Sequence, residues 1–299
     1  MQEYRPYSMV RVPSKGFYYP NKKDRFFVRF LTYEEEYILT DENIMQQGDG
    51  LKQVLESVII DDFDVNLLVP GDVQAISLFL RSSGYGDKIA LDVTCPKCKA
   101  KQEKEVLLSN LKMKEVDIVP DNGTMFNLGL PDSKKQLKLR VPTFAEEMRA
   151  EQRGEKGFVD KLKRIIMELD GAEDERVIAR AVPNMSMKDS RYLKDFLNRN
   201  TPGVDTSVNH VCDSCQFQFT QPFSTGYNFL RLPANYRENM MEQLFSISYH
   251  SKGGITWSDA VKMPTLERIW MMRRINKAIK EENDQIKKAQ KGSAGTRKA

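Results

Sequence analysis

The four cysteines of this 299-residue chain fall into two C-x-x-C pairs, and this pattern limits the possible folds more than any other. The first pair is Cys95 and Cys98, the second is Cys212 and Cys215, and there is no other cysteine. Strand-like runs flank each pair, as in a hairpin whose turn points two thiolates at one spot. Two such zinc knuckles complete a tetrahedral site. The sequence therefore predicts one structural zinc ion per chain.

Other uses of paired cysteines fit the sequence less well. A thioredoxin-like redox pair opens a helix after a buried strand, and neither pair does so. Structural disulfides are typical of small secreted chains, whereas this N-terminus does not resemble a secretory signal and 40% of the residues are hydrophobic. Ordinary buried cysteines are a further alternative, and four thiolates would also hold iron. A closed four-cysteine site has no open position, so we expect a structural metal.

The chain repeats one order of patterns in its two halves. A strand-like run leads to Thr32 in the first half and to Thr143 in the second, each followed by an aromatic residue and acids that indicate a capped helix. These threonines are 111 residues apart, and the cysteine pairs are 117 apart. We predict an internal duplication with the zinc between the halves on a pseudo-twofold axis; coincidence among common patterns is the alternative. The matching amphipathic helices are expected at 51–59 and 69–81, and at 159–166 and 185–198.

The predicted fold class is α+β. Two similar α+β units are joined by a four-cysteine, zinc-ribbon-like site, and a helical region follows at the C-terminus. A hairpin around Pro131 is expected in the crossover between the units. The expected domains are an N-terminal arm (1–21), a first unit with its knuckle (22–110), the crossover hairpin with the second unit and its knuckle (111–227), a C-terminal helical region (228–284) and a disordered basic tail (285–299).

Two segments outside the repeated units carry candidate partner-binding residues. One is the aromatic arm, and the other is a long helix that begins near Pro264. Packing of each segment on its own domain is the alternative. The candidate residues are Pro13, Phe17, Tyr18 and Tyr19 in the arm, and Leu266, Ile269 and Trp270 in the helix.

The sequence contains no recognised catalytic motif. It has no H-E-x-x-H, G-x-S-x-G, P-loop or G-x-G-x-x-G pattern, and it has only two histidines. His210 lies two residues before Cys212, and we expect it to face solvent from a strand. We therefore predict a protein that is not an enzyme; a hydrolase with an unrecognised site has no positive support.

The positive charge of the chain is concentrated at its end. The net charge is +4, yet residues 273–299 hold nine basic and three acidic residues, so the rest is slightly acidic. This pattern favours a solvated tail over a nucleic-acid site. A nucleic-acid-binding zinc ribbon is the alternative, because Lys97, Lys99, Lys101 and Lys104 surround the first knuckle.

Several stretches resemble the baseplate hub and hub-assembly proteins of T4-type bacteriophages. They are residues 12–19, 28–36 and 83–86, and 263–270 ahead of a charged helix. The resemblance implies a non-enzymatic part or assembly factor of the central hub of a contractile tail. It implies a location in the virion tail baseplate or in the host cytoplasm during assembly, with other tail proteins as partners. A homo-oligomer is a further possibility. No membrane partner is expected, because the sequence has no run of 18 apolar residues.

Overall fold

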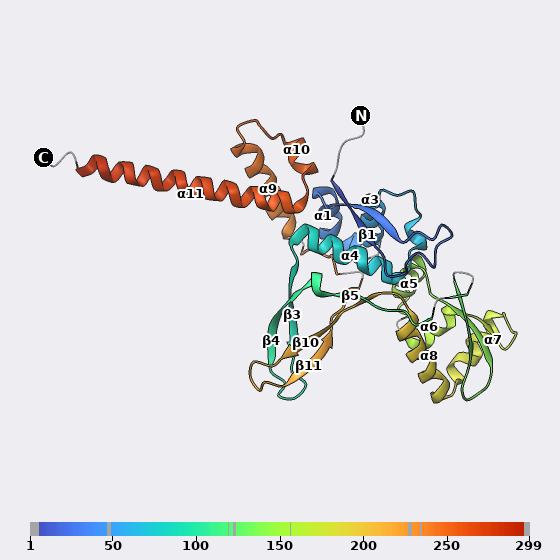
Figure 1. Cartoon of the computed structure of the whole chain (residues 1–299). Coiled ribbons are helices and arrows are strands. Elements are labelled where there is room, and N and C mark those ends of the chain that lie inside the picture. Colours follow the sequence, from blue (N-terminus) through green and yellow to red (C-terminus); the bar gives the residue numbers. More distant parts are fainter. Residues whose placement is uncertain are drawn as a thin grey trace.

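The structure, a computed structural model, describes residues 6–46, 49–118, 120–121, 124–155, 157–226, 229–233 and 235–295. This part of the chain mixes helices with short antiparallel strands and ends in a helical region, as the sequence predicts. From the central region, two hairpins project together on one side and a long helix projects on another (Figure 1). None of the helices in these ranges combines the length and the apolar character that a membrane span requires.

The first half builds a small sheet covered by helices. Strand β1 (Tyr7–Arg11) pairs antiparallel with β2 (Arg25–Arg29), and Val28 of β2 also bridges Ile59 on its other side. The alternation of β2 buries Phe26 and Val28 and leaves Phe27 exposed. The helices of this half are α1 (Tyr33–Thr40), α2 (Glu42–Gln46), α3 (Asp49–Val58), the 3₁₀ turn η1 (Val65–Leu67) and α4 (Pro70–Tyr85).

The second half builds a three-stranded sheet in the order β6–β7–β8. The predicted hairpin around Pro131 is confirmed, since β6 (Met125–Gly129) pairs antiparallel with β7 (Gln136–Arg140). Strand β8 (Ile166–Leu169) pairs with the other edge of β7. The helices are α5 (Phe144–Gln152), α6 (Phe158–Ile165), α7 (Glu175–Ala181), the 3₁₀ turn η3 (Val182–Asn184) and α8 (Met187–Asn200).

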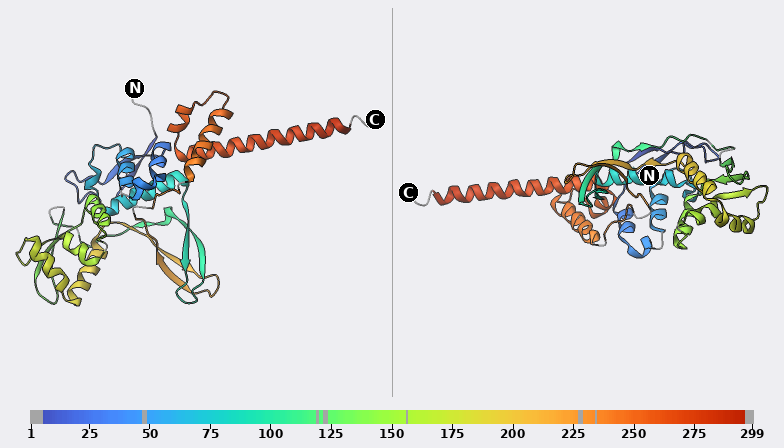
Figure 2. Two further views of the ribbon diagram at one scale, coloured as in Figure 1. Left: turned by 180° about the vertical axis from the view of Figure 1, so that it is seen from behind. Right: turned by 90° about the horizontal axis from the view of Figure 1, so that it is seen from below.

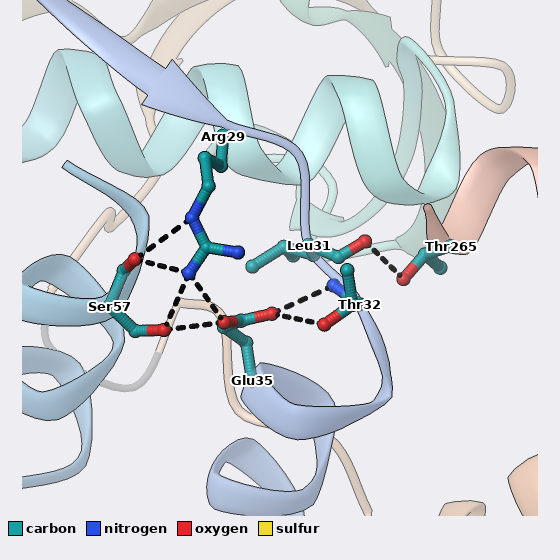
Figure 3. Close-up of polar contacts among 6 residues, drawn as sticks. All are labelled: Arg29, Leu31, Thr32, Glu35, Ser57 and Thr265. Atoms are coloured by element: carbon teal, nitrogen blue, oxygen red, sulfur yellow. Dashed lines mark hydrogen bonds and ion pairs between the residues drawn. The ribbon is translucent and has the colours of Figure 1, made fainter. Parts of the chain in front are cut away.

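A capping network begins α1 directly after strand β2. The N–H and hydroxyl of Thr32 both donate to Oε2 of Glu35, at 2.9 and 2.7 Å (Figure 3). The other carboxylate oxygen of Glu35 accepts from the Ser57 hydroxyl at 2.5 Å and from Arg29 at 3.4 Å. Because Glu35 is fully buried, these donors replace the water that a carboxylate requires.

The second half uses the same spacing of residue types. Arg140 donates to both carboxylate oxygens of Glu146, at 2.7 and 2.5 Å. Thr143 caps α5 by accepting from the Glu146 N–H and donating its own N–H to the Glu146 carboxylate. Both helices therefore start with an Arg-x-x-Thr-x-x-Glu sequence in which Arg, Thr and Glu interact.

One hydrophobic core runs through both halves. Fully buried residues of the first half belong to the same cluster as those of the second, so the core is continuous across the predicted boundary at 110/111. Large members of this cluster include Phe26, Leu55, Leu80, Leu137, Phe144 and Leu193. A separate small cluster of Leu244, Ile247 and Ala260 lies in the C-terminal region.

The C-terminal region consists of α9 (Tyr236–His250), α10 (Trp257–Lys262) and α11 (Thr265–Gly295). Helix α11 is anchored to the first half where it begins, because the N–H of Thr265 donates to the Leu31 carbonyl at 2.8 Å (Figure 3 shows the matching hydroxyl contact). One turn later, the fully buried guanidinium of Arg268 pairs with the fully buried carboxylate of Glu36. Nε of Arg268 also donates to Gln243 of α9 at 2.9 Å.

Two tyrosines complete the surroundings of the Glu36 carboxylate. The hydroxyls of Tyr85 and Tyr236 donate to its Oε1 at 3.1 and 3.2 Å. Burial, together with the charge of Glu36, raises the pKa of Tyr236 to about 12 and that of Tyr85 well above its ordinary value. Both phenols therefore remain protonated donors, and Glu36 joins α1, α4, α9 and α11 at one point.

The N-terminal segment packs on its own domain. Pro13 and Tyr19 are buried, which corrects the prediction that they bind partners. The Tyr19 hydroxyl donates to Asp72 at 2.5 Å and accepts from the Val69 N–H at 3.1 Å. Asp72 also accepts from the Ser14 N–H at 2.9 Å. The aromatic turn is thus fixed to the start of α4.

The end of the chain also differs from the prediction. Helix α11 continues to Gly295 and so includes the first eleven residues of the tail that the sequence predicts as disordered from 285. Lysine, glutamine and alanine are strong helix formers, so a helix already begun at Thr265 extends through them. Residues 1–5 of the predicted arm and 296–299 of the tail lie outside the described residues.

Replacing the buried arginine tests the anchor of α11. Arg268→Met leaves the Glu36 charge buried without its cation, so we expect a loss of about 3–5 kcal/mol in the free energy of unfolding. Urea unfolding followed by circular dichroism measures this loss. The control Arg273→Met changes an exposed arginine of the same helix and should alter the free energy by less than about 0.5 kcal/mol. Equal effects of the two variants would contradict the anchor.

Asp72 gives the stability of the fold a defined pH dependence. Burial raises its pKa from 3.8 to about 6, although hydrogen bonds from Ser14 and Tyr19 act to lower it. The folded protein therefore keeps a proton that the unfolded chain releases, and this stabilisation is complete below pH 3.8 and lost as the pH rises through 6. We expect the free energy of unfolding of wild type, minus that of Asp72→Asn, to fall by about 3 kcal/mol as the pH rises from 3.8 to above 6.

Urea unfolding of both proteins at several pH values from 4 to 7 measures that difference. Both proteins carry the same cysteines, so any pH response of the cysteine cluster cancels. A difference that stays constant with pH would show that Asp72 does not titrate in this window.

Candidate metal centre

Each cysteine pair lies at the tip of an antiparallel hairpin. The first hairpin is formed by β3 (Lys88–Thr94) and β4 (Lys101–Leu107), and the second by β10 (Ser207–Val211) and β11 (Gln218–Pro222). The two hairpins lie side by side in Figure 1 and from behind in Figure 2. Their turns therefore meet, although 117 residues separate the cysteine pairs.

The two turns have the same backbone structure. The N–H of Cys95 donates to the Ala100 carbonyl at 3.0 Å, and the N–H of Cys212 donates to the Phe217 carbonyl at 3.0 Å. The residue after the second cysteine of each pair donates back to the first cysteine, at 2.9 and 2.8 Å. That residue is left-handed in both turns, with φ of 60° at Lys99 and 56° at Gln216. Both turns thus present their two sulfur atoms in the same way.

The four sulfur atoms have the spacing of a tetrahedral metal site. The Sγ atoms of Cys95 and Cys215 are 3.8 Å apart, those of Cys98 and Cys212 are 3.5 Å apart, and all four lie within 4.8 Å of one another. A tetrahedron with metal–sulfur bonds of about 2.3 Å places sulfurs about 3.8 Å apart. The pairs come from different hairpins, and all four cysteines are free of disulfide bonds. The cluster can therefore hold one metal ion, and its donors fit zinc.

Polar contacts between the hairpins fix their relative position. The side-chain amide of Gln102 donates to Sγ of Cys212 at 2.9 Å, and its oxygen accepts from the Asp213 N–H at 3.0 Å. Lys104 pairs with Asp213 at 2.5 Å, and the Lys97 ammonium lies 5.7 Å from the centre of the Phe217 ring. Each contact joins the first hairpin to the second, so these contacts hold the hairpins together alongside any metal that the cysteines bind.

Electrostatic repulsion among the closely spaced cysteine thiolates favours a bound cation. Burial acts to raise the pKa of Cys212, but donors including the Cys215 N–H and the Gln102 amide lower it to about 6. The Phe217 N–H acts to lower the pKa of Cys215, but burial and the other three sulfurs raise it to about 12. Four thiolates this close repel one another, and a divalent cation removes that repulsion.

Helix α4 holds the second hairpin against the first. The Gln74 side chain accepts from the Val204 N–H at 2.8 Å and donates to the Thr225 hydroxyl at 2.7 Å, on either side of the second hairpin. A Cβ at Gly71 would lie 2.0 Å from the Pro202 carbonyl oxygen, so only glycine permits this approach. Just beyond, β5 (Lys112–Met113) pairs with β9 (Val204–Asp205) and joins the bases of the hairpins.

His210 differs from its prediction. Its side chain is 6% exposed and packs against the Phe219 ring at 5.5 Å, so it does not face solvent. Burial lowers its pKa, and the nearby charge of Lys104 adds to this effect.

Sequence reasoning also missed Gln102. No local signal marks that residue, because its role depends on how two distant hairpins cross.

The remaining predicted partner residues lie on two separate elements. Phe17 is exposed and Tyr18 is half-buried, and with Leu67 and Pro120 they line an apolar cavity of about 710 Å³. On α11, Leu266 and Trp270 are exposed, and Ile269 is half-buried. Pro13 and Tyr19 are buried, and Tyr19 also lines this cavity.

Metal analysis of the purified protein tests the site directly. We expect a colourless protein with one zinc per chain, and we expect Cys95→Ser and Cys212→Ser to lose the metal equally because the hairpins share it. The control Ser214→Ala lies in the same turn and should keep one zinc. Mass spectrometry of metal content measures these values. A metal-free wild-type monomer that remains folded would refute the site.

Comparison with known proteins identifies the family. Searches of curated proteins and of solved structures found no match. A family model described as T4 bacteriophage base plate protein matches residues 18–231, which include β2, the three-stranded sheet, both hairpins and all four cysteines, and cover more than half of the chain. The chain therefore belongs to the family of T4 bacteriophage base plate proteins.

Proposed function

We propose that this protein is a component or assembly factor of the central hub in the baseplate of a contractile phage tail. It acts by binding other tail proteins and catalyses no reaction. The family match over residues 18–231 is the observation that carries the proposal. On this proposal, the protein works in the virion tail, or in the host cytoplasm while the baseplate is built.

We propose further that the scaffold arose by internal duplication. Val28 bridges Ile59 antiparallel in the first half, and Leu139 pairs antiparallel with Ile166 in the second. In both halves the next long helix leads to a cysteine hairpin, and the two hairpin turns share the same hydrogen bonds. The Arg-x-x-Thr-x-x-Glu capping sequence also occurs once in each half. These matches support two copies of one unit related by a pseudo-twofold axis at the metal.

A structural zinc ion suits the role of this scaffold. The four sulfurs of a Cys₄ site fill a tetrahedral zinc and leave no position for a substrate. The ion would join two hairpins that also share polar contacts near their tips, so metal binding would be coupled to the folding of both. The result would be a rigid scaffold that holds the partner-binding surfaces of the protein in fixed positions.

We assign partner contacts to exposed residues of the arm and of α11. Trp270 is 59% exposed and Leu266 is 47% exposed, one turn apart on the helix. Phe17 is 41% exposed beside the apolar cavity of the arm. Large exposed apolar side chains that gather in this way are typical of protein-binding surfaces.

Affinity purification of the tagged protein from infected cells tests the proposal. We expect tail and baseplate proteins to co-purify in fixed ratio, and we expect Leu266→Ala/Trp270→Ala to reduce their recovery while the protein stays folded. The control Met187→Ala changes an exposed apolar residue on α8, far from α11 in Figure 1. Recovery of nucleic acid or polymerase subunits in place of tail proteins would overturn the proposal in favour of a nucleic-acid-binding zinc ribbon.

A further inference from the structure

Helix α11 extends far beyond the elements that it packs against. At about 1.5 Å per residue its 31 residues span about 46 Å. Figures 1 and 2 show most of that length pointing away from the rest of the chain. Residues 280–288 are exposed throughout. Tertiary packing is the usual source of helix stability, and this part of α11 has none within the described residues.

Four apolar residues of α11 lie on one seam that Glu282 interrupts. Met272, Ile275, Ile279 and Ile286 fall at alternating steps of three and four residues, with Glu282 at the remaining position. This is the spacing of a coiled-coil seam. Met272 and Ile275 pack against the C-terminal cluster of Leu244, Ile247 and Ala260, so helices α9 and α10 cover the start of the seam. Farther along the seam Ile279 is half-buried, and among the side chains that the structure describes the cover ends there, since residues 280–288 are exposed and Ile286 is 55% exposed.

The polar residues of α11 are arranged around this seam. At about 100° per residue, the positions directly beside it are uncharged, and the charged residues gather on the opposite side. Glu282 is the one charged residue on this face between Met272 and Ile286, and the otherwise uncharged face is the pattern of a helix with one covered side. The flanking residues are Asn276, Ala278, Asn283 and Gln285, and the charged ones are Arg273, Arg274, Lys277, Lys280, Glu281, Asp284, Lys287 and Lys288.

Glu282 decides which partner suits the seam. In a parallel pair of two copies, Glu282 would face itself across the interface. In an antiparallel pair aligned through Ile275 and Ile286, it would face Ile279. The uncharged flanking positions supply no cation in either case, so a second copy would leave two carboxylates in an apolar contact without a partner. A helix of another protein that places a Lys or Arg there removes this cost.

We propose that the seam formed by Met272, Ile275, Ile279, Glu282 and Ile286 binds an amphipathic helix of another protein. The partner helix continues the cover that α9 and α10 begin, packs apolar residues on Ile279 and Ile286, and pairs a basic residue with Glu282. This inference deepens the assembly role proposed above and rests on it. The seam lies opposite Leu266 and Trp270, so α11 offers two separate surfaces.

Two synthetic helical peptides test the seam on the purified full-length protein. Each has isoleucine and leucine at its seam positions, and they differ only in a lysine or a glutamate opposite Glu282. Isothermal titration calorimetry measures the dissociation constants. We expect the lysine peptide to bind about tenfold or more tightly than the glutamate peptide, because like charges across a contact disfavour binding. In Glu282→Lys we expect the preference to reverse.

Glu281→Lys is the matched control. It makes the same change of charge one residue away, on the far side of the helix where Glu281 pairs with Lys277 at 3.9 Å, and it should leave the preference unchanged. Ile279→Asp should abolish binding of both peptides. Three results would overturn the proposal: no binding of the lysine peptide at about 100 µM, an unchanged preference in Glu282→Lys, or a wild-type dimer in light scattering that Ile279→Asp dissociates. Because this test needs only purified protein, its outcome is separate from that of the co-purification.

Discussion

Four thiol groups from two distant hairpins converge on one small volume, where the hairpins of the two halves of the chain meet. The sulfurs cannot all ionise at 3.5–3.8 Å without a cation, and a cation cannot be bound unless both hairpins are in place. Helix α4 supplies the geometry, since Gly71 and Gln74 hold the chain that enters and leaves the second hairpin. The two halves are also joined by the hydrophobic core that they share.

A second buried electrostatic contact sets the direction of the C-terminal helix. Glu36 and Arg268 are both fully buried, and each would be costly to bury without the other. Since Tyr85 and Tyr236 also donate to Glu36, α11 leaves the body from a point fixed by several helices. The free length of α11 is therefore presented at a defined angle, which is a useful property for a helix that binds another protein.

Local rules account for most of what could be predicted. The capped helices after Thr32 and Thr143, the hairpin at Pro131 and the strands beside each cysteine pair all depend on neighbouring residues, and all form. Apart from the longer α11, the predictions that differ concern burial. Tyr19 is buried where its hydroxyl donates to Asp72, more than 50 residues away, and Pro13 is buried next to Ser14, whose N–H donates to the same carboxylate. His210 is buried beside the ring of Phe219, its partner on the next strand, and close to Lys104 of the first hairpin.

The sequence by itself determined the four candidate metal ligands, the order of elements in each half and the charge distribution of the last helix, because these follow from residue type and spacing. Tertiary structure alone decided that the sulfurs converge, that Gln102 donates to Cys212, and that the two halves share one core. It also decided which side of α11 is covered and which is free. These properties arise from contacts between residues far apart in the chain, whose geometry is fixed only when the whole fold packs.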